Sequence, residues 1–387
     1  MLKRTLYNEE HEMFRDAVRA WAKKEVFPHL EAWNEAGCVS REVWRKAGEE
    51  GYLCMYADEK YGGLGIDDFR YDMILLEELS SRASGLFLGL HNRIVGPYLQ
   101  HFATEEQRAR FMPGVVSGET ILAIGMTEPG TGSDLAGIKT RAVDMGDHWL
   151  LNGSKTYISN GLLADLVLVA ARTNPESSHE IGLFWVEGDM PGFSRGRKLK
   201  KLGLDSQDTA ELFFDDVKIP KENVLGDPVK GFTTMMLNLA EERLQGAVGF
   251  AARAEHAFEL TLEFITERQA FGQPVGTFQN SRFKMASMRT EIDAAWAFTD
   301  HCAKAHMNGE LSAEMAAEVK LFTSDVEARV VDECLQLHGG AGFMDEYEIS
   351  RLYRDARVSR IYGGTSEIMR EIIGRGLGLG EPRRKTG

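Results

Sequence analysis

The sequence predicts an α+β protein in which a helical N-terminal domain and a C-terminal four-helix-bundle domain flank a middle antiparallel β domain. Apolar residues recur at helical spacing before about residue 120 and again after about residue 229, whereas short β-branched runs separated by prolines lie between. With 387 residues, 43% of them hydrophobic, the chain can bury several cores, which excludes a disordered protein. We expect domains at residues 1–120, 121–228 and 229–387.

In the N-terminal domain, a period near 3.6 residues from Met13 to Trp21 predicts a first helix. Further helices are expected over Tyr71–Ser80 and Asn92–Phe102. Thr104, followed by acidic residues, is a candidate N-cap for the next helix, and Pro113 is expected to close that helix.

In the middle domain, Asn152-Gly153 is expected to form a two-residue hairpin turn between strands at 149–151 and 154–158. Strands so closely spaced favour an antiparallel sheet or barrel over βαβ units. Three further apolar runs are expected to be strands: Asp165–Ala171, Ile181–Val186 and Glu211–Phe214.

In the C-terminal domain, prolines become rare and residues with high helix propensity dominate, which predicts a bundle of long helices. The expected helices cover Glu241–Arg268, Gln279–Asn308 and Ser312–Leu337.

The charge balance excludes some partners. The chain carries 45 basic and 59 acidic residues, a net charge of −14, which does not suit a nucleic acid backbone. The apolar window Leu162–Ala171 is too short to span a bilayer, so we expect no membrane association. We expect a cytoplasmic protein, or one of an organelle matrix if a transit peptide was removed. No CxxC or HExxH spacing occurs, so we expect no metal site and reduced thiols at four cysteines: Cys38, Cys54, Cys302 and Cys334.

Standard nucleotide-binding signatures are absent, because no GxGxxG follows a strand and no phosphate-binding GxxxxGK[ST] loop occurs. Four loops rich in glycine and hydroxyl residues stand out instead. Small residues let a ligand approach the backbone, and hydroxyl groups supply hydrogen bonds, although each loop alone is equally a simple turn. The loops are Met126–Asp134, Lys155–Gly161, Gln336–Phe343 and Tyr362–Ile368.

Together with Arg268–Gly272, Gln279 and Tyr61–Gly63, these loops resemble the acyl-CoA dehydrogenase family in order and position, from about Asn8 to Leu379. The resemblance implies a protein that binds FAD noncovalently and oxidises medium-chain, long-chain or branched acyl-CoA thioesters to trans-2-enoyl-CoA, as in fatty acid β-oxidation. It also implies electron transfer to an electron-transfer flavoprotein and a homotetramer built as a dimer of dimers.

The resemblance assigns roles to individual residues. Met126, Thr127 and Ser133 resemble flavin-loop residues, with Ser133 also near the CoA arm, and Tyr157 and Ser159 resemble the pair beside the isoalloxazine ring. Residues similar to those that hold the FAD adenine and pyrophosphate from a neighbouring subunit are Arg268, Phe271, Gln279, Gln336, Gly339 and Gly340, with Thr365 and Glu367 as final contacts. The expected substrate contacts are Ser133, Phe232, Thr233, Arg243, Gly363 and Gly364.

The catalytic base is expected at Glu242. Removal of an α-proton from a thioester needs a carboxylate, and burial of that carboxylate on substrate binding strengthens it as a base. Many family members carry this Glu directly after the Tyr of the last loop, where this chain has Gly363. The long-chain and isovaleryl branches place the base directly before an Arg on a helix, a position that Glu242 matches and Glu241 does not. Gly363 can still donate its backbone N–H to the thioester oxygen.

Three alternatives stay open. Glu241 and Glu242 can be a solvated acidic pair, which leaves the protein without a base. The chain can be an acyl-CoA oxidase-like flavoenzyme that reduces oxygen. It can also be a noncatalytic or DNA-associated relative, although a pI of about 5.3 does not favour DNA.

Overall fold

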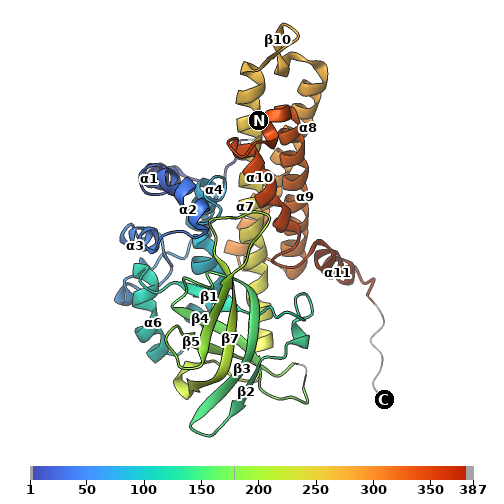
Figure 1. Cartoon of the computed structure of the whole chain (residues 1–387). Helices are drawn as coiled ribbons and strands as arrows, with labels where there is room; N and C mark the ends of the chain where they lie inside the picture. Colours follow the sequence, from blue (N-terminus) through green and yellow to red (C-terminus); the bar gives the residue numbers. More distant parts are fainter. Residues whose placement is uncertain (1–2, 178, 381–387) are drawn as a thin grey trace. The chain divides into compact units, whose positions relative to one another are not determined.

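The computed structural model describes residues 3–177 and 179–380 (Figure 1). The chain forms two compact units. Among the described residues, the sheet unit contains those within 13–238, and the bundle unit contains residues 3–12 and 239–380. The dividing points lie inside two helices, α1 (Glu9–Glu25) and α7 (Gly231–Glu267). None of the described helices is both long enough and apolar enough to cross a membrane.

The first half of the sheet unit is helical, as predicted. The Thr104 hydroxyl accepts a hydrogen bond from the N–H of Gln107 at 3.2 Å, and the Gln107 side chain accepts one from the N–H of Thr104, so the predicted N-cap is confirmed. After α1, the helices are η1 (Phe27–His29), α2 (Leu30–Ala36), α3 (Arg41–Glu49), η2 (Glu59–Tyr61), α4 (Phe69–Ser80), the π-helix η3 (Leu90–Val95), α5 (Gly96–Phe102) and α6 (Glu105–Ser117).

The prediction that Pro113 closes α6 is wrong. The helix continues to Ser117 and ends at Gly118, which has a left-handed backbone. Pro113 is exposed, whereas Val115 and Val116 beyond it are buried in the core of the sheet unit. Packing of these two valines outweighs the hydrogen bond that a proline removes from a helix.

The strands form one eight-stranded sheet in the order β6-β7-β3-β2-β4-β5-β8, with β1 paired to β4. Most pairs are antiparallel, as expected, but β1 and β2 each run parallel to β4. The strands are β1 (Leu122–Gly125), β2 (Arg141–Asp144), β3 (His148–Ser159), β4 (Leu166–Arg172), β5 (Ile181–Glu187), β6 (Phe193–Lys198), β7 (Thr209–Pro220) and β8 (Val224–Leu225), with the one-turn helices η4 (Leu135–Gly137) and η5 (Lys221–Asn223) between them.

The predicted hairpin turn at Asn152-Gly153 is wrong, because both residues lie inside the continuous strand β3. The register with β7 shifts between Leu151 and Gly153, where Asp215 and Asp216 of β7 lie opposite the single residue Asn152, so β7 forms a bulge at this point. The Asn152 side chain binds Asp216 of β7 through two hydrogen bonds, of 2.9 and 3.0 Å, which hold the bulge in place. The hairpin turn lies instead at Gly146, between β2 and β3.

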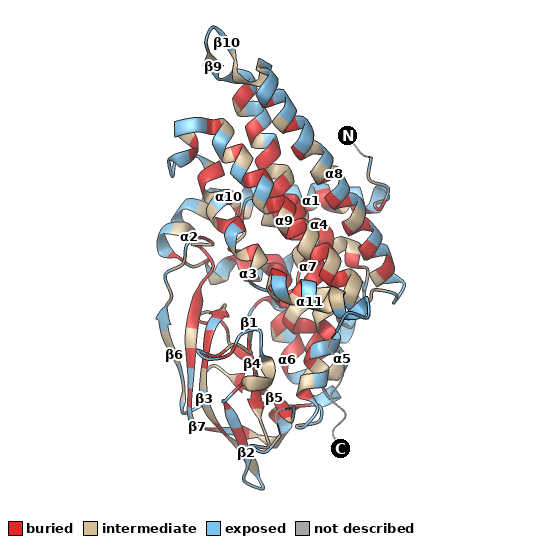
Figure 2. Cartoon of the chain, turned by 90° about the vertical axis from the view of Figure 1, so that its right-hand side faces the viewer, coloured by how far each residue is buried: buried red, intermediate tan, exposed pale blue. Residues whose placement is uncertain are grey.

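Both faces of β4 are buried, which explains its uninterrupted apolar sequence (Figure 2). Successive side chains of a strand point to opposite faces. Leu166 and Leu168 pack in a core shared with α5 and α6, whereas Val167 and Val169 pack with apolar residues of β3 and β7. The sheet therefore curves so that β3 and β7 share a core with β4 and β5.

The bundle unit is built from long helices whose buried stripes are visible in Figure 2. At its centre, the buried Arg253 of α7 donates to Glu327 of α9 at 2.5 Å and to the hydroxyl of Ser359 at 3.1 Å. Besides α7, this unit contains the hairpin strands β9 (Gln269–Ala270) and β10 (Gln273–Pro274), then η6 (Val275–Thr277), α8 (Gln279–Met307), α9 (Ala313–His338), η7 (Gly339–Phe343), α10 (Glu348–Ala356), η8 (Arg357–Arg360) and α11 (Ser366–Gly376).

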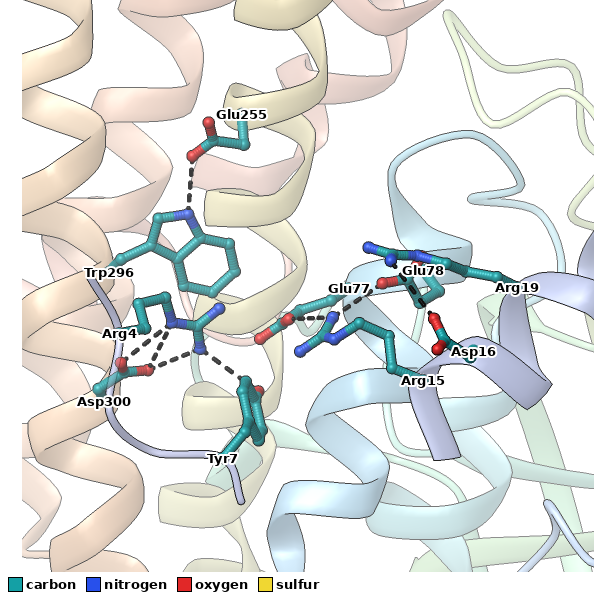
Figure 3. A network of polar contacts seen from close by, with 10 residues as sticks. All are labelled: Arg4, Tyr7, Arg15, Asp16, Arg19, Glu77, Glu78, Glu255, Trp296 and Asp300. Atoms are coloured by element: carbon teal, nitrogen blue, oxygen red, sulfur yellow. Dashed lines mark hydrogen bonds and ion pairs between the residues drawn. The ribbon is translucent and has the colours of Figure 1, made fainter. Parts of the chain in front are cut away.

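The segment before α1 is tied to α8 in the bundle unit (Figure 3). Arg4 binds both carboxylate oxygens of Asp300, with contacts as short as 2.6 Å, and its guanidinium lies 4.0 Å from the ring centre of Trp296. The Trp296 indole in turn donates to Glu255 of α7 at 3.0 Å. Within the sheet unit, Figure 3 also shows Arg15 of α1, whose guanidinium contacts two carboxylates of α4.

We expect Arg4→Met to lower the free energy of unfolding by about 1–3 kcal/mol, because it leaves the largely buried carboxylate of Asp300 without its bidentate partner. Arg4→Lys keeps the positive charge but not the planar guanidinium that binds both carboxylate oxygens, so it should lower the free energy of unfolding by about half as much. Urea unfolding followed by circular dichroism measures both changes. A midpoint for Arg4→Met equal to that of the unsubstituted protein would contradict this account.

The fully buried His91 of η3 makes the sheet unit sensitive to acid. Its Nε2 donates to the carbonyl oxygen of Val115 at 2.9 Å, while its Nδ1 has no partner among the described residues. Burial lowers the pKa of His91 to about 4, well below the ordinary histidine value of about 6.5. The unfolded chain therefore binds the proton more readily, and stability falls as the pH drops from about 6.5 to about 4.

We expect His91→Gln to reduce the pH dependence of the unfolding free energy, because unfolding would then take up as much as one proton fewer. Over the whole interval this difference corresponds to about 3 kcal/mol. Urea unfolding at several pH values between 7 and 4.5 measures the slope. His301→Gln, at an exposed position of α8, is the matched control and should leave the slope unchanged. Parallel slopes for His91→Gln and the unsubstituted protein would refute the prediction.

Candidate active site

The first two glycine-rich loops come together in the sheet unit. The N–H of Thr156 donates to the carbonyl oxygen of Thr127 at 2.9 Å, and the Lys155 ammonium donates to the carbonyl oxygen of Met126 at 3.0 Å. These bonds place Met126 and Thr127 beside the end of β3, where Tyr157 is exposed and has a left-handed backbone with φ of 60°. Two predicted flavin-loop residues, Met126 and Thr127, therefore lie close to Tyr157 and Ser159, the pair predicted beside the isoalloxazine ring.

A buried ion pair, which the sequence analysis missed, organises this surface. Lys155 is fully buried and its ammonium lies 2.8 Å from the Glu128 carboxylate, which also accepts hydrogen bonds from the N–H groups of Lys139 and Thr140. Burial lowers the pKa of Lys155 to about 8. Burial alone would raise the pKa of Glu128, but Lys155 and the N–H donors hold it below its ordinary value. The signal available in the sequence was one charged residue within each of the first two glycine-rich loops, Glu128 and Lys155.

The donor groups on this surface fit the edge of a flavin ring. Among the described residues, no hydrogen-bond partner is found for the hydroxyls of Thr127, Ser133 and Ser159. A Cβ atom at Gly130 or Gly132 would meet no atom of the described residues within 4 Å, so the loop is open to an approaching ligand. Unpaired hydroxyls beside an open loop suit a ring that presents carbonyl oxygens and ring nitrogens.

In the bundle unit, the two adjacent glutamates of α7 have different surroundings. The Glu241 carboxylate lies 3.6 Å from Nε2 of His306 on α8. Neighbouring side chains on a helix diverge by about 100°, so Glu242 occupies another face. Glu242 is only partly buried, and its charge is felt by the buried guanidinium of Arg243. Burial lowers the pKa of Arg243, and the Glu242 carboxylate acts in the opposite direction.

The last glycine loop lies in the same unit. Gly363 and Gly364 both have left-handed backbones, with φ of 66° and 96°. The ammonium of Lys320, a buried residue of α9, donates to the carbonyl oxygen of Gly364 at 2.7 Å. The pKa of Lys320 is lowered to about 8, first by burial and then by the positive charge of Arg243. Lys320 is a second residue of this region that the sequence analysis missed.

The remaining cofactor candidates form two groups in the bundle unit. One group is exposed at the end of the bundle where α7 ends, α8 begins and α9 ends, and contacts such as the stacking of Phe264 on His338 join these helices. The most exposed member is Phe271, with 97% of its surface accessible. This group contains Arg268, Phe271, Gln279, Gln336, Gly339 and Gly340.

The second group, Thr365 and Glu367, begins α11, which packs along the N-terminal half of α9. The Thr365 hydroxyl caps the helix by accepting from the N–H of Ile368 at 3.3 Å. The backbone N–H of Glu367 and then the Thr365 hydroxyl hold the pKa of the Glu367 carboxyl below its ordinary value. Lys320 of α9 binds Gly364, the residue directly before the second group. Gln336 of the first group lies about 24 Å farther along α9 than Lys320, at 1.5 Å per residue. Within a single chain, the two groups of candidate residues therefore lie several helical turns apart.

Two substrate candidates lie in the first turns of α7, within the sheet unit. Phe232 packs on the core of that unit, with its ring edge-to-face on His179 at 5.4 Å, whereas Thr233 is exposed. Phe232 is thereby held against the apolar core of the sheet unit.

Comparison with known proteins identifies the class to which this fold and site belong. Family models of the acyl-CoA dehydrogenase N-terminal, middle and C-terminal domains match residues 8–119, 123–217 and 229–378. The mitochondrial long-chain specific acyl-CoA dehydrogenase of Mus musculus is 45% identical over 375 residues, which cover 96% of this chain and 87% of that protein. The mitochondrial isovaleryl-CoA dehydrogenase of Oryza sativa subsp. japonica is 34% identical over 377 residues, covering 96% and 92%.

Solved structures agree. The acyl-CoA dehydrogenase of Geobacillus kaustophilus superposes with a TM-score of 0.96 at 47% identity, over 97% of this chain and 100% of that one. A glutaryl-CoA dehydrogenase of Mycobacterium smegmatis, solved in complex with FADH2, superposes with a TM-score of 0.91 at 28% identity, over 98% and 97%. The chain belongs to the acyl-CoA dehydrogenase family and is a flavin-dependent oxidoreductase of that class.

Proposed function

We propose that this protein oxidises acyl-CoA thioesters with a long straight chain or a branched chain to trans-2-enoyl-CoA, with FAD as its cofactor and Glu242 as its base. The observation that carries the proposal is the difference in surroundings between two adjacent glutamates of α7. The Glu241 carboxylate lies next to His306, whereas Glu242 lies beside the buried Arg243. Gly363, at the position where many family members carry the base, offers no carboxylate.

The residues of this chain then act in sequence. The thioester binds with its α-carbon near Glu242, and closure of the site around the acyl chain removes water from the carboxylate and strengthens it as a base. Glu242 takes the α-proton, and the backbone N–H groups of Gly363 and Gly364 donate to the thioester oxygen as negative charge builds on it. A bound flavin would supply the acceptor for the hydride that leaves the β-carbon.

Specific residues are proposed to hold the cofactor. Met126, Thr127, Ser133, Tyr157 and Ser159 would contact the flavin ring, with hydroxyls that have no other partner among the described residues. The exposed group at the end of the bundle would hold the adenine and pyrophosphate of the cofactor of a second copy, while Thr365 and Glu367 complete the site. Separation of the two groups along α9 supports a cofactor site shared between subunits, and hence a homotetramer organised as a dimer of dimers.

Anaerobic mixing of the FAD-loaded protein with a panel of acyl-CoAs, from butyryl to stearoyl and including isovaleryl, tests the proposal. We expect the flavin absorbance to bleach fastest with a long or branched substrate, and an electron-transfer flavoprotein to restore it. Steady peroxide release without any carrier would indicate an oxidase. No bleaching with any thioester, or salt-sensitive retention on DNA in its place, would refute the proposal.

A further inference from the structure

Lys320 is a buried cation without an anionic partner. Only 1% of its surface is exposed, and no carboxylate among the described residues lies within ion-pair distance of its ammonium. Its one hydrogen-bond acceptor in the described structure is the carbonyl oxygen of Gly364, 2.7 Å away. A lysine is almost never buried unless it is paired, and a buried charge that costs stability is a candidate for a functional role.

The backbone that Lys320 holds is otherwise weakly fixed. On one side, the N–H of Tyr362 donates to the carbonyl oxygen of Val358, and on the other side Thr365 caps α11. Between these two anchors, Gly363 and Gly364 are free of side chains and adopt left-handed conformations that cost glycine little. No backbone hydrogen bond is found for the N–H of either glycine within the described part of the chain. These N–H groups are available to a ligand.

The charges around Lys320 favour an anion at this loop. Arg243 reaches the same region from α7, and its Nε has no partner among the described residues. The other charged groups that Lys320 feels are Asp325 and Glu327 of α9 and Glu367 of α11. When Glu242 takes a proton, the electron pair of the broken C–H bond moves into the enolate, and the new negative charge rests on the thioester oxygen. Two buried cations beside the loop would stabilise that charge.

We propose that Lys320 is a positioning residue for this reaction: it fixes the Gly363–Gly364 backbone so that its N–H groups meet the thioester oxygen as that oxygen becomes negative. The inference rests on the proposed function and adds to it a residue outside the flavin and substrate contacts. Lys320 touches neither substrate nor cofactor in this scheme and acts through the loop.

A 3-thia-acyl-CoA isolates the step concerned, because it can lose its α-proton but has no β-hydrogen to transfer. Its bound enolate is measured by long-wavelength charge-transfer absorbance with the flavin as the pH is varied. In Lys320→Met we expect the apparent pKa of the bound analogue to rise by about one unit or more, and the rate of flavin reduction by acyl-CoA to fall about 10- to 100-fold, with little change in KM. Lys304→Met, at an exposed position of α8, is the matched control and should behave like the unsubstituted protein.

Lys320→Arg supplies a second measurement that does not depend on the folding of the methionine variant. The rate of the unsubstituted protein should fall above about pH 8 as Lys320 loses its proton, whereas a guanidinium keeps its charge and should remove this alkaline decline. The inference would be overturned if FAD-loaded Lys320→Met left the apparent pKa of the bound 3-thia-acyl-CoA unchanged. It would also be overturned if the rate of Lys320→Arg showed the same decline at alkaline pH. Failure of the unsubstituted protein to deprotonate the analogue would refute the proposed function instead.

Discussion

Replacement of Glu242 by Gln should slow the reduction of bound flavin by acyl-CoA by about 10³- to 10⁴-fold, because the amide cannot accept the α-proton. Gln has nearly the same shape as Glu, so the variant should still fold and bind FAD with an unchanged visible spectrum. Stopped-flow absorbance under anaerobic conditions measures the rate, and equilibrium dialysis measures the cofactor content.

Glu241→Gln is the matched control, one residue earlier on the same helix. Its carboxylate lies 3.6 Å from His306, so its loss should remove a partly exposed ion pair worth about 1 kcal/mol or less and leave the rate within about threefold. Retained bleaching in Glu242→Gln, or an equal loss in both variants, would show that the base lies elsewhere.

A carboxylate returned to the last glycine loop should rescue the inactive variant. Among the atoms that the structure describes, a Cβ atom at Gly363 would meet only the Cε atom of Lys320, at 3.9 Å, which is ordinary contact. The φ of 66° would cost a glutamate about 1–2 kcal/mol, which a folded domain can tolerate. We expect Gly363→Glu in the Glu242→Gln background to regain at least about 100-fold in flavin reduction.

The neighbouring glycine provides the control for this rescue. A Cβ atom at Gly364 would lie 2.6 Å from the Cε atom of Met369, and its φ of 96° is one that residues with a side chain rarely adopt. Gly364→Glu in the same background should therefore regain nothing and lose stability. If both substitutions restored flavin reduction equally, or if neither did, a glutamate at position 363 could not be said to replace Glu242 as the base. Reduction by a panel of acyl-CoAs also shows whether the relocated base changes the preferred chain length.

Features that depend on neighbours in the sequence were predictable, and those that depend on distant partners were not. The Thr104 cap involves residues three apart, so the local pattern is sufficient. Asn152-Gly153 has the composition of a hairpin turn, but pairing with β7, where Asp216 binds Asn152 from 64 residues away, keeps both residues inside a continuous strand opposite a bulge. Pro113 likewise stays within a helix because of tertiary packing.

The same distinction applies to the candidate site. Glu242 could be proposed because a neighbouring Arg and the glycine at 363 form a recognisable pattern. Lys155 and Lys320 could not be assigned roles, because their acceptors lie 29 and 44 residues away. A sequence shows that a lysine is present, but only the fold shows that it is buried and which carbonyl it holds.

The proposed division of the cofactor contacts between two distant parts of α9 has a consequence for the purified protein. If two copies must meet to enclose each cofactor, saturation with FAD obeys mass action in protomer concentration as well as in FAD. Dilution alone would then turn a yellow preparation pale, and the melting temperature would fall with the colour. Preparations compared at different concentrations would differ in specific activity without any difference in sequence or folding of the single chain.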